Sequence, residues 1–559
     1  MNVWHFPRKV IVFLLLITAF RLWFCTQLEL AGDEAYYWLW SKHLDFGYFS
    51  KGPGVAWTIA AGTCIFGDTV FGIRCFAVLL AAGTSGLLYI LARGLFSDSV
   101  AWKCILLASV IPLFAVGSIL MTIDPLSVFF WALAALFFWR AKDTTSPAFW
   151  ILTGAAVGLG SLCKYTNLAE LICFALFCLW CPKYRRHLCG FTFPAMALVS
   201  LAALTPVLIW NQQHNWVTFQ HLVHRGGLDR SWRFSVVEFS QFLGQQAGVI
   251  SPLVFAGVLV ALFWALRQVA GGAEPQGEFP RLSTKKLGEG QSAKSSSSAP
   301  SASPPLHGGE GGEVIAVTDS RIGSRASGSS GGDGNVNRAV ELRFLLSLFF
   351  PLFAFYTVLS FNDSGQANWT APCYVSGIIL LVSQWTSFIR QTRWARGLAA
   401  FAVLLAVSET GLLHDTFWLK LPSRRDPLSR LRGSKDLARQ VASMQETLGA
   451  KFIIANKYSY ASLVSFYHPQ RQQTFIPHSR EIQNQFSFWP GYHENYPHGS
   501  AIFVADSEEI PAQLKTEFAS VEKLKETYAE YRGRPIKKFY LTLCRELQDL
   551  PEEQSTNAK

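Results

Sequence analysis

Long apolar runs alternate with short polar segments along most of this chain, up to about residue 413. Each run approaches the ~20 residues that an α-helix needs to cross the hydrocarbon core of a bilayer. By that length rule we count about eleven candidate spans. They lie near residues 10–28, 69–92, 101–119, 125–140, 148–163, 165–182, 190–210, 246–267, 342–360, 369–387 and 396–413. The pattern therefore predicts a mainly α-helical, polytopic membrane bundle.

Two segments depart from this pattern. Residues 269–340 are rich in Ser, Gly and Pro and poor in apolar side chains, so we expect a disordered loop. Within 415–559, the pattern indicates an amphipathic helix at 435–448 and buried strands at 451–455 and 501–505. The chain is thus expected to have four regions. They are an N-terminal membrane region (1–268, with its first outer loop at 29–68), the loop (269–340), further spans (341–414) and a small, soluble α/β domain (415–559).

Composition and charge agree with a membrane protein. Half of the 559 residues are apolar and only 16% are charged, which is too apolar for a soluble chain of this length. Basic residues cluster in loops that fall on one side when the spans are counted in order, and the positive-inside rule makes that side cytoplasmic. The N-terminus and the 269–340 loop are then inside, and 415–559 is outside. Because the net charge of +11 comes mostly from these anchors, no basic face is left for a nucleic acid.

An acidic pair follows the first apolar run. Asp33 and Glu34 lie in an aromatic segment just beyond the membrane edge, where insertion does not require acids. The pair is a candidate for a general base, or for a divalent metal site held by Asp33 and Glu34. An ordinary solvated pair of loop acids is the alternative.

Further polar residues are expected on the same membrane face. Asp124 opens a span just before Pro125, where capping a helix is its structural alternative. Lys164 lies between two spans and could instead extend toward the interface. Together these residues place acids, cations and amides on the face opposite the basic anchors. The outer loops hold Asp33, Glu34, Lys51, Asp124, Lys164, Tyr165, Asn211, His214, His221, His224, Arg225, Asn362, Asp363 and Asn368.

The order of these motifs resembles a known family. Residues 32–37 followed by 50–57 resemble the first outer loop of the protein O-mannosyltransferase-like glycosyltransferases, which include the bacterial lipid A aminoarabinose transferases. Segments 122–126, 160–166, 206–211, 368–372, 426–433 and 484–489 are similar to further motifs of bacterial members. The resemblance covers most of 1–270 and 341–500. Two departures matter: the family's Lys-Pro-Pro is here Lys51-Gly52-Pro53, and Ser50 stands where some members carry an acid. A metal site that needs this extra carboxylate is therefore in doubt.

The resemblance implies a GT-C type membrane fold in the bacterial inner membrane, with catalytic residues in the first outer loop. It also implies a donor sugar carried on a polyprenyl phosphate. Such a transfer needs a base for the acceptor hydroxyl and positive charge for the departing phosphate. Asp33 is the best candidate for the base, and Glu34 either tunes it by like-charge repulsion or holds a divalent ion with it. Asp124 is a further catalytic candidate.

The remaining candidates would bind substrate. Lys51 is the best phosphate partner, supported by Arg225 and Lys164. Tyr36 and Tyr37 could stack on the sugar, or could instead lie in an aromatic belt at the membrane interface. Tyr165 and Asn368 lie in the motifs that resemble the family. They complete the expected substrate-binding set.

The sequence therefore predicts a membrane glycosyltransferase. It would move a sugar from a polyprenyl-phosphate donor to a hydroxyl of a lipid, glycan or protein acceptor on the outer membrane face. Since no covalent nucleophile is evident, a single displacement with inversion is favoured. The alternatives are a lipid or sugar transporter, in which polar groups would lie near mid-membrane beside broken helices, and a scaffold that displays the outer domain.

Overall fold

The computed structural model describes residues 6–144, 146–229, 231–271, 330–423, 425–479 and 481–549. Most of the Ser-, Gly- and Pro-rich loop expected at 269–340 therefore lies outside the described residues. Within them, helices dominate up to His414 and a single five-stranded sheet follows. The general class that the sequence predicts, a mainly helical chain with several long apolar helices, is confirmed.

Every apolar run of the sequence is helical in the structure. Eight runs are built around one principal helix each. These helices are α1 (Arg8–Phe24), α4 (Val70–Leu95), α7 (Ile123–Ala141), α8 (Pro147–Cys163), α9 (Ala169–Trp180), α16 (Ser330–Leu359), α17 (Cys373–Gln391) and α18 (Arg393–His414). The other runs are broken pairs: α5 (Asp98–Val110) with α6 (Pro112–Gly117), α11 (Thr192–Ala202) with α12 (Thr205–Gln213), and α14 (Val236–Ile250) with α15 (Pro252–Ala270).

Proline explains two of these breaks, the one between α5 and α6 and the one between α14 and α15. A proline lacks the N–H that would continue the helix, and it pushes the preceding residue out of the helical region. Ile111, before Pro112, is extended with ψ 129°, and Ser251, before Pro252, has φ 76° and ψ 131°. Within the described residues, five helices are long and apolar enough to cross a membrane, or up to seven if two bent pairs each count as one span. The expected count of about eleven spans is therefore not confirmed by length and composition.

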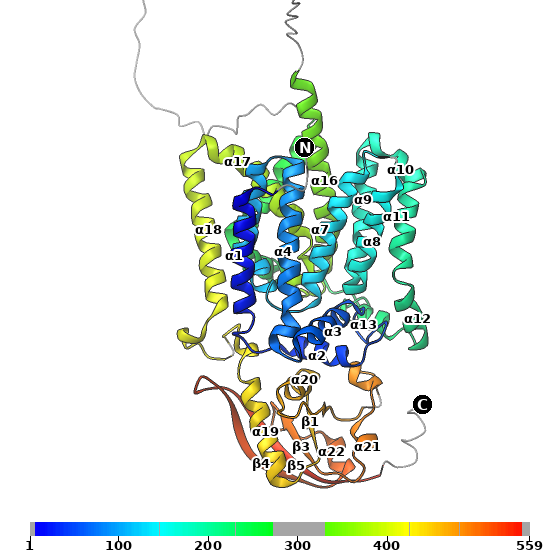
Figure 1. Cartoon of the computed structure of the whole chain (residues 1–559), viewed down its shortest axis with the longest axis vertical. Helices are drawn as coiled ribbons and strands as arrows, with labels where there is room; N and C mark the ends of the chain where they lie inside the picture. The colour runs from blue at the N-terminus through cyan, green and yellow to red at the C-terminus, as the bar shows by residue number, and fades with distance from the viewer. Residues whose placement is uncertain are drawn as a thin grey trace, which may run out of the picture.

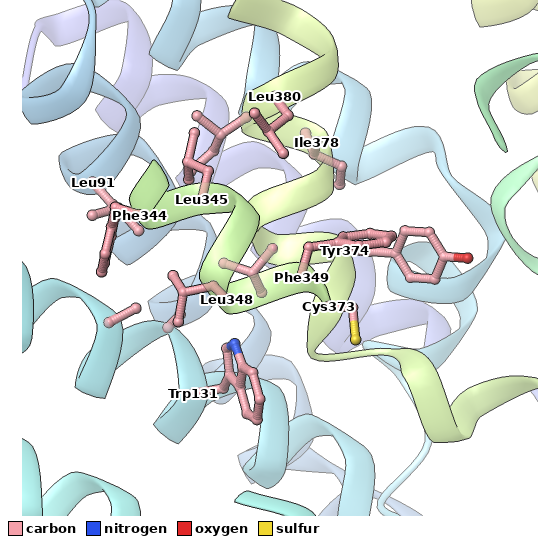
Figure 2. Packing of buried hydrophobic residues seen from close by; sticks show 14 of the residues in the cluster. Leu91, Trp131, Phe344, Leu345, Leu348, Phe349, Cys373, Tyr374, Ile378 and Leu380 are labelled. Atoms are coloured by element: carbon pink, nitrogen blue, oxygen red, sulfur yellow. The ribbon is translucent and has the colours of Figure 1, made fainter. Parts of the chain in front are cut away.

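The core of the helical bundle lies where α7, α16 and α17 meet. Phe349 of α16 packs on Tyr374 of α17 with ring centroids 6.0 Å apart, and Leu348 of α16 and Trp131 of α7 are buried in the same cluster (Figure 2). Lipid is as apolar as these side chains, so close van der Waals packing between the helices holds such a bundle together.

Shorter helices cap the two ends of the bundle. The end that faces the C-terminal domain carries α2 (Gly32–Lys42), α3 (Gly54–Phe66) and α13 (Val217–Arg225) (Figure 1). The opposite end carries the start of α1, the short helix α10 (Arg186–Cys189) and the junction of α17 and α18 (Figure 1). The segment that carries Asp33 and Lys51 thus lies at the domain end.

The C-terminal domain is built on a mixed sheet with strand order β2-β1-β3-β5-β4. β1 (Phe452–Ala455) runs parallel to β2 (Thr474–Phe475) and β3 (Ala501–Ala505). β5 (Arg534–Leu547) is antiparallel to β3 and to β4 (Phe518–Tyr531). The helices are α19 (Ser434–Leu448), α20 (Tyr458–Tyr467), α21 (Tyr492–Asn495) and α22 (Ala512–Glu517). The predicted helix and two strands coincide with α19, β1 and β3, whereas the long β4–β5 hairpin was not predicted.

The domain docks directly on the first loop of the membrane region. The Leu30 N–H donates to the Tyr467 hydroxyl at 2.8 Å. Gln485 bridges the two parts: its Oε1 accepts from the Phe49 N–H at 2.7 Å, and its own N–H donates to the Tyr36 hydroxyl at 2.6 Å. The loop that carries the candidate acids is therefore held between the helical bundle and the domain.

Candidate active site

The two adjacent acids lie in different environments. Glu34 is completely buried and forms a bidentate ion pair with Arg74 of α4, with Nε–Oε1 and Nη2–Oε2 distances of 2.8 and 2.6 Å. Its oxygens also accept the Met121 N–H at 2.8 Å and the Ala31 N–H at 2.9 Å. The Arg74 guanidinium also donates hydrogen bonds to the backbone carbonyls of Cys25, Leu28 and Glu29. Glu34 therefore joins α2, α4 and the segment before α7.

Asp33, in contrast, is exposed at the start of α2. The Tyr458 hydroxyl, from α20 of the C-terminal domain, donates to its Oδ1 at 3.2 Å. Tyr458 in turn packs on Tyr36, with ring centroids 4.5 Å apart. Burial and the nearby Asp33 charge raise the pKa of Tyr458 to about 12, so it stays a proton donor to the carboxylate. One carboxylate oxygen of Asp33 makes no hydrogen bond within the described part of the chain.

The expected metal site does not fit this arrangement. Both oxygens of Glu34 already accept hydrogen bonds from Arg74 and from backbone amides, so they are not oriented to share a cation with Asp33. Among the described residues, no three His, Cys, Asp or Glu side chains are grouped to hold a metal ion.

Asp124, Lys164 and Asn368 come together from three parts of the chain. Lys164 Nζ lies 2.8 Å from Asp124 Oδ1, and Asn368 Nδ2 donates to Asp124 Oδ2 at 2.5 Å. Lys164 also donates to the Asn368 carbonyl at 3.3 Å, and its side chain is only 8% exposed. The cap of α7 is Thr122, whose hydroxyl accepts the Asp124 N–H. The structural alternatives, a capping Asp124 and an outward-reaching Lys164, are therefore wrong.

Lys51 lies beside this group because its loop packs tightly on the end of α8. A side chain at Gly52 would come within 2.2 Å of the Leu162 carbonyl, so only glycine allows this approach. Burial, followed by the positive charges of Lys164 and Arg225, lowers the pKa of Lys51 to about 8.

Arg225, which is exposed at the end of α13, belongs to the same electrostatic neighbourhood. His221, one turn before it, has its pKa lowered to about 4 by burial and by the charges of Lys51 and Arg225. We call Lys51, Lys164 and Arg225 the cationic cluster. The charges of Asp124 and Asp33 act on Lys51 in the opposite direction, so both acids border the cluster.

The aromatic candidates divide by position. Tyr36 lies in the domain interface, where its hydroxyl accepts the Gln485 N–H and its ring stacks on Phe486 at 5.9 Å. Tyr37 is buried beside Asp33, and burial and that charge hold its pKa well above the usual value. Tyr165 is the next residue after Lys164, and its buried hydroxyl has no partner within the described residues. Tyr37 and Tyr165 thus keep polar groups near the acids and the cationic cluster.

Two residues of this region were missed by the sequence analysis. The sequence did offer a clue to Arg74, because a lone arginine inside an apolar run is destabilising unless an acidic partner is present. Tyr458 carried none, since it lies in a separate domain and reaches Asp33 only through the docking of α20 on α2.

Comparisons with known proteins agree with the motifs. The model of the family described as dolichyl-phosphate-mannose-protein mannosyltransferase matches residues 50–210. A lipid A galacturonosyltransferase of Rhizobium johnstonii is 24% identical over 458 residues, 79% of this chain and 80% of that protein. The chain is thus similar to this mannosyltransferase family over residues 50–210, and to a lipid A sugar transferase over most of its length. The enzyme class predicted from the sequence is thereby confirmed, and the transporter alternative is not supported.

Two further similarities bear on the donor and on the fold. An undecaprenyl phosphate-α-4-amino-4-deoxy-L-arabinose arabinosyl transferase of Pseudomonas aeruginosa is 32% identical over 219 residues, which span 35% of this chain and only 39% of that protein. The structure of ArnT from Cupriavidus metallidurans bound to undecaprenyl phosphate superimposes with a TM-score of 0.57 at 15% identity, covering 96% of this chain and 97% of that one. The chain therefore has the fold of ArnT.

Proposed function

We propose that this chain transfers a sugar from a polyprenyl-phosphate donor to a hydroxyl of a lipid A-type acceptor in the bacterial inner membrane. The observation that carries the proposal is the cationic cluster bordered by Asp33 and Asp124 at the domain end of the bundle. The names of the relatives, a lipid A galacturonosyltransferase and a family of undecaprenyl-phosphate arabinosyl transferases, support the choice of donor and acceptor.

The cationic cluster is suited to the donor phosphate. Burial, followed by the charges of Lys164 and Arg225, lowers the pKa of Lys51, and an anion bound beside Lys51 would offset the repulsion from these two cations. Lys51 would donate charge-assisted hydrogen bonds to the phosphate, and the exposed Arg225 would close over it. As the bond from the anomeric carbon to the phosphate oxygen breaks, the same charges stabilise the electron pair that leaves with the phosphate.

Asp33 is suited to be the general base. Its carboxylate is exposed and receives one hydrogen bond from Tyr458, which leaves an oxygen for the acceptor hydroxyl. Asp33 would take the hydroxyl proton while the acceptor oxygen forms its bond to the anomeric carbon. Because attack and departure then lie on opposite faces of the sugar, the configuration at this carbon inverts.

The other acids would position these groups. Asp124 holds Lys164 and Asn368 beside Lys51 and Arg225, and both of its carboxylate oxygens are engaged by these two side chains. Glu34 fixes α2, and hence Asp33, against α4. We therefore propose positioning roles for Asp124 and Glu34 in place of the catalytic roles that the sequence suggested. Tyr37 and Tyr165 are proposed to contact substrate, while Tyr36 supports the loop from the domain interface.

The function is tested by incubating the purified protein with radiolabelled polyprenyl-phosphate sugars and lipid A. Transfer of label to lipid A, with one sugar preferred, is the expected result. If the label reached only protein or polysaccharide, the acceptor would not be a lipid and this part of the proposal would be wrong. Absence of transfer from every lipid-linked donor would contradict the whole proposal.

Lys51→Ala tests the phosphate site. The substitution removes a charge-assisted hydrogen bond, so donor affinity is expected to fall ~10-fold or more. Lys51→Arg should keep part of the affinity because the charge is retained. In the wild type, donor affinity should also weaken as the pH rises through about 8, where Lys51 loses its proton. Donor titrations at several pH values measure both effects. If Lys51→Ala bound the donor with wild-type affinity, Lys51 would not bind the phosphate, and Arg225 would be the next candidate.

The topology is a further part of the proposal. We propose about eleven spans, with the N-terminus and the 269–340 loop in the cytoplasm and the 415–559 domain in the periplasm. Protease added to sealed inside-out vesicles is expected to cut within 269–340 and to spare the domain. Vesicles of the opposite orientation serve as the control. If the domain were cut in inside-out vesicles, the orientation and the assignment of the acids to the outer face would both be wrong.

A further inference from the structure

A cavity of about 340 Å³ opens inside the helical bundle. Residues of α4, α5, α6, α7, α17 and α18 line it together with the last turn of α14, and nearly all of them are apolar or small. The charged residues among those that line it are Arg21 and Asp124. A molecule that fills this space must therefore be mostly hydrocarbon.

Arg21 is the unusual member of this lining. It lies in the last turn of α1 and is only 4% exposed, so its side chain points into the protein instead of reaching the membrane surface. Within the described residues its guanidinium makes no hydrogen bond and no ion pair. Arg74, which is equally buried, is paired with Glu34 and three backbone carbonyls. Burying a guanidinium without a partner destabilises the fold, so its presence indicates that the charge binds a ligand.

The position of Arg21 indicates the depth of its partner. It precedes the end of α1 by three residues, or ~4.5 Å along the helix axis. This is the end of α1 nearer the C-terminal domain, whereas the rest of the cavity extends into the bundle along α4 to Leu88 (Figure 1). A ligand that suits this arrangement has an anion at the domain end and hydrocarbon inside the bundle, as a phosphate-bearing lipid does.

The far side of the cavity is bordered by Asp124 and Asn368, which hold Lys164 of the cationic cluster. The cavity therefore joins Arg21 to the proposed site of transfer. Lys51 and Arg225 are not among the described residues that line it. A polyprenyl chain extending from a phosphate at Lys51 could enter the cavity, but such a chain has no second anion to offer Arg21. The acceptor lipid can provide one.

We propose that this cavity receives acyl chains of the acceptor and that Arg21 binds a phosphate of its head group. Arg21 is then a specificity-determining residue that selects phosphorylated lipid acceptors. This inference rests on the proposed transfer to a lipid. It adds a second anion site, separate from the donor phosphate site at Lys51.

The test compares lipid A with its dephosphorylated form as acceptors for the wild type, Arg21→Gln, Arg21→Lys and the control Arg396→Gln. Arg396 is exposed on α18 at the opposite end of the bundle. For Arg21→Gln, the KM for phosphorylated lipid A is expected to rise ~10–100-fold, the usual range for losing a hydrogen bond to a charged group. The KM for the dephosphorylated acceptor and the affinity for the donor should stay as in the wild type. Arg21→Lys should recover part of the loss, and Arg396→Gln should change nothing.

Thermal unfolding of the lipid-free proteins gives a readout that does not depend on activity. Because Arg21 has no hydrogen-bond or ion-pair partner among the described residues, Arg21→Gln should unfold at the wild-type temperature or above it. Equal losses on both acceptors, or a loss of donor affinity, would overturn the assignment of Arg21 to the acceptor phosphate. An unchanged KM in an active Arg21→Gln enzyme would also overturn it while leaving the proposed function intact. Failure of the wild type to modify any lipid would instead contradict the proposed function.

Discussion

Asp33→Asn is expected to lower the rate of sugar transfer by ~10²–10⁴-fold, the usual contribution of a general base. The amide keeps the size of the side chain and can still accept the hydrogen bond from Tyr458, but it cannot take the acceptor proton. Donor affinity should change little, because the proposed phosphate site lies at Lys51 and Arg225. Single-turnover transfer of radiolabelled sugar, measured together with a donor titration, separates the two effects.

Three controls sharpen this test. Tyr458→Phe removes only the hydrogen bond to Asp33, so its effect on turnover should be far smaller. Asp68→Asn changes another acid of the same loop, one that pairs with Lys42 at 2.6 Å, and should leave turnover near normal. A chelator should not inhibit the wild type, since Glu34 is not oriented to share a cation with Asp33. Near-normal turnover by a folded Asp33→Asn protein would show that Asp33 is not the general base. Inhibition by the chelator that a divalent ion reverses would show that the enzyme needs a metal ion after all.

The helical part of the fold was predictable because a bilayer leaves few options. Backbone groups in hydrocarbon must bond within their own segment, so each long apolar run had to be a helix. The breaks were less predictable. Pro112 and Pro252 interrupt their runs, whereas Pro351 lies inside α16 without ending it. The difference depends on how neighbouring helices accommodate the lost hydrogen bond, which sequence periodicity does not report.

The C-terminal sheet was predicted only where its strands are fully buried. β1 and β3 have continuous apolar runs and were found. β4 is rich in Lys and Glu and is largely exposed, so it has no apolar signal. Its long pairing with β5 makes it a strand, and such non-local pairing outweighs the weak preference of charged residues for other structures.

The candidate site was predicted as a set of residues but not as a set of contacts. Counting polar residues on one membrane face placed Asp124, Lys164 and Asn368 together, and the structure joins them by hydrogen bonds. The same count could not separate Asp33 from Glu34, because adjacent helix residues point in different directions and their partners lie far along the chain. Only the packing of α4 against α2 decides that Glu34 is buried and paired.

Arg74→Ala is expected to destabilise the folded protein by ~3–5 kcal/mol, the usual cost of leaving one partner of a buried ion pair alone. Among the described residues, Glu34 would keep two backbone N–H groups as partners, and the carbonyls of Cys25, Leu28 and Glu29 would lose the Arg74 donor. Glu34→Gln should also destabilise the protein, because Arg74 would keep its hydrogen bonds to carbonyls and lose its counter-charge. Denaturant or thermal unfolding in detergent micelles measures these changes.

The matched control is Lys42→Ala, which breaks the ion pair with Asp68. Both partners of that pair are more than one third exposed, so its loss should cost less than ~1 kcal/mol. The two proposed roles of Glu34 then separate clearly. If Glu34 positions α2, Glu34→Gln lowers stability, and residual turnover follows the fraction of folded protein. If Glu34→Gln instead unfolded like the wild type and lost turnover as Asp33→Asn does, the positioning role would be wrong and Glu34 would act in the chemistry.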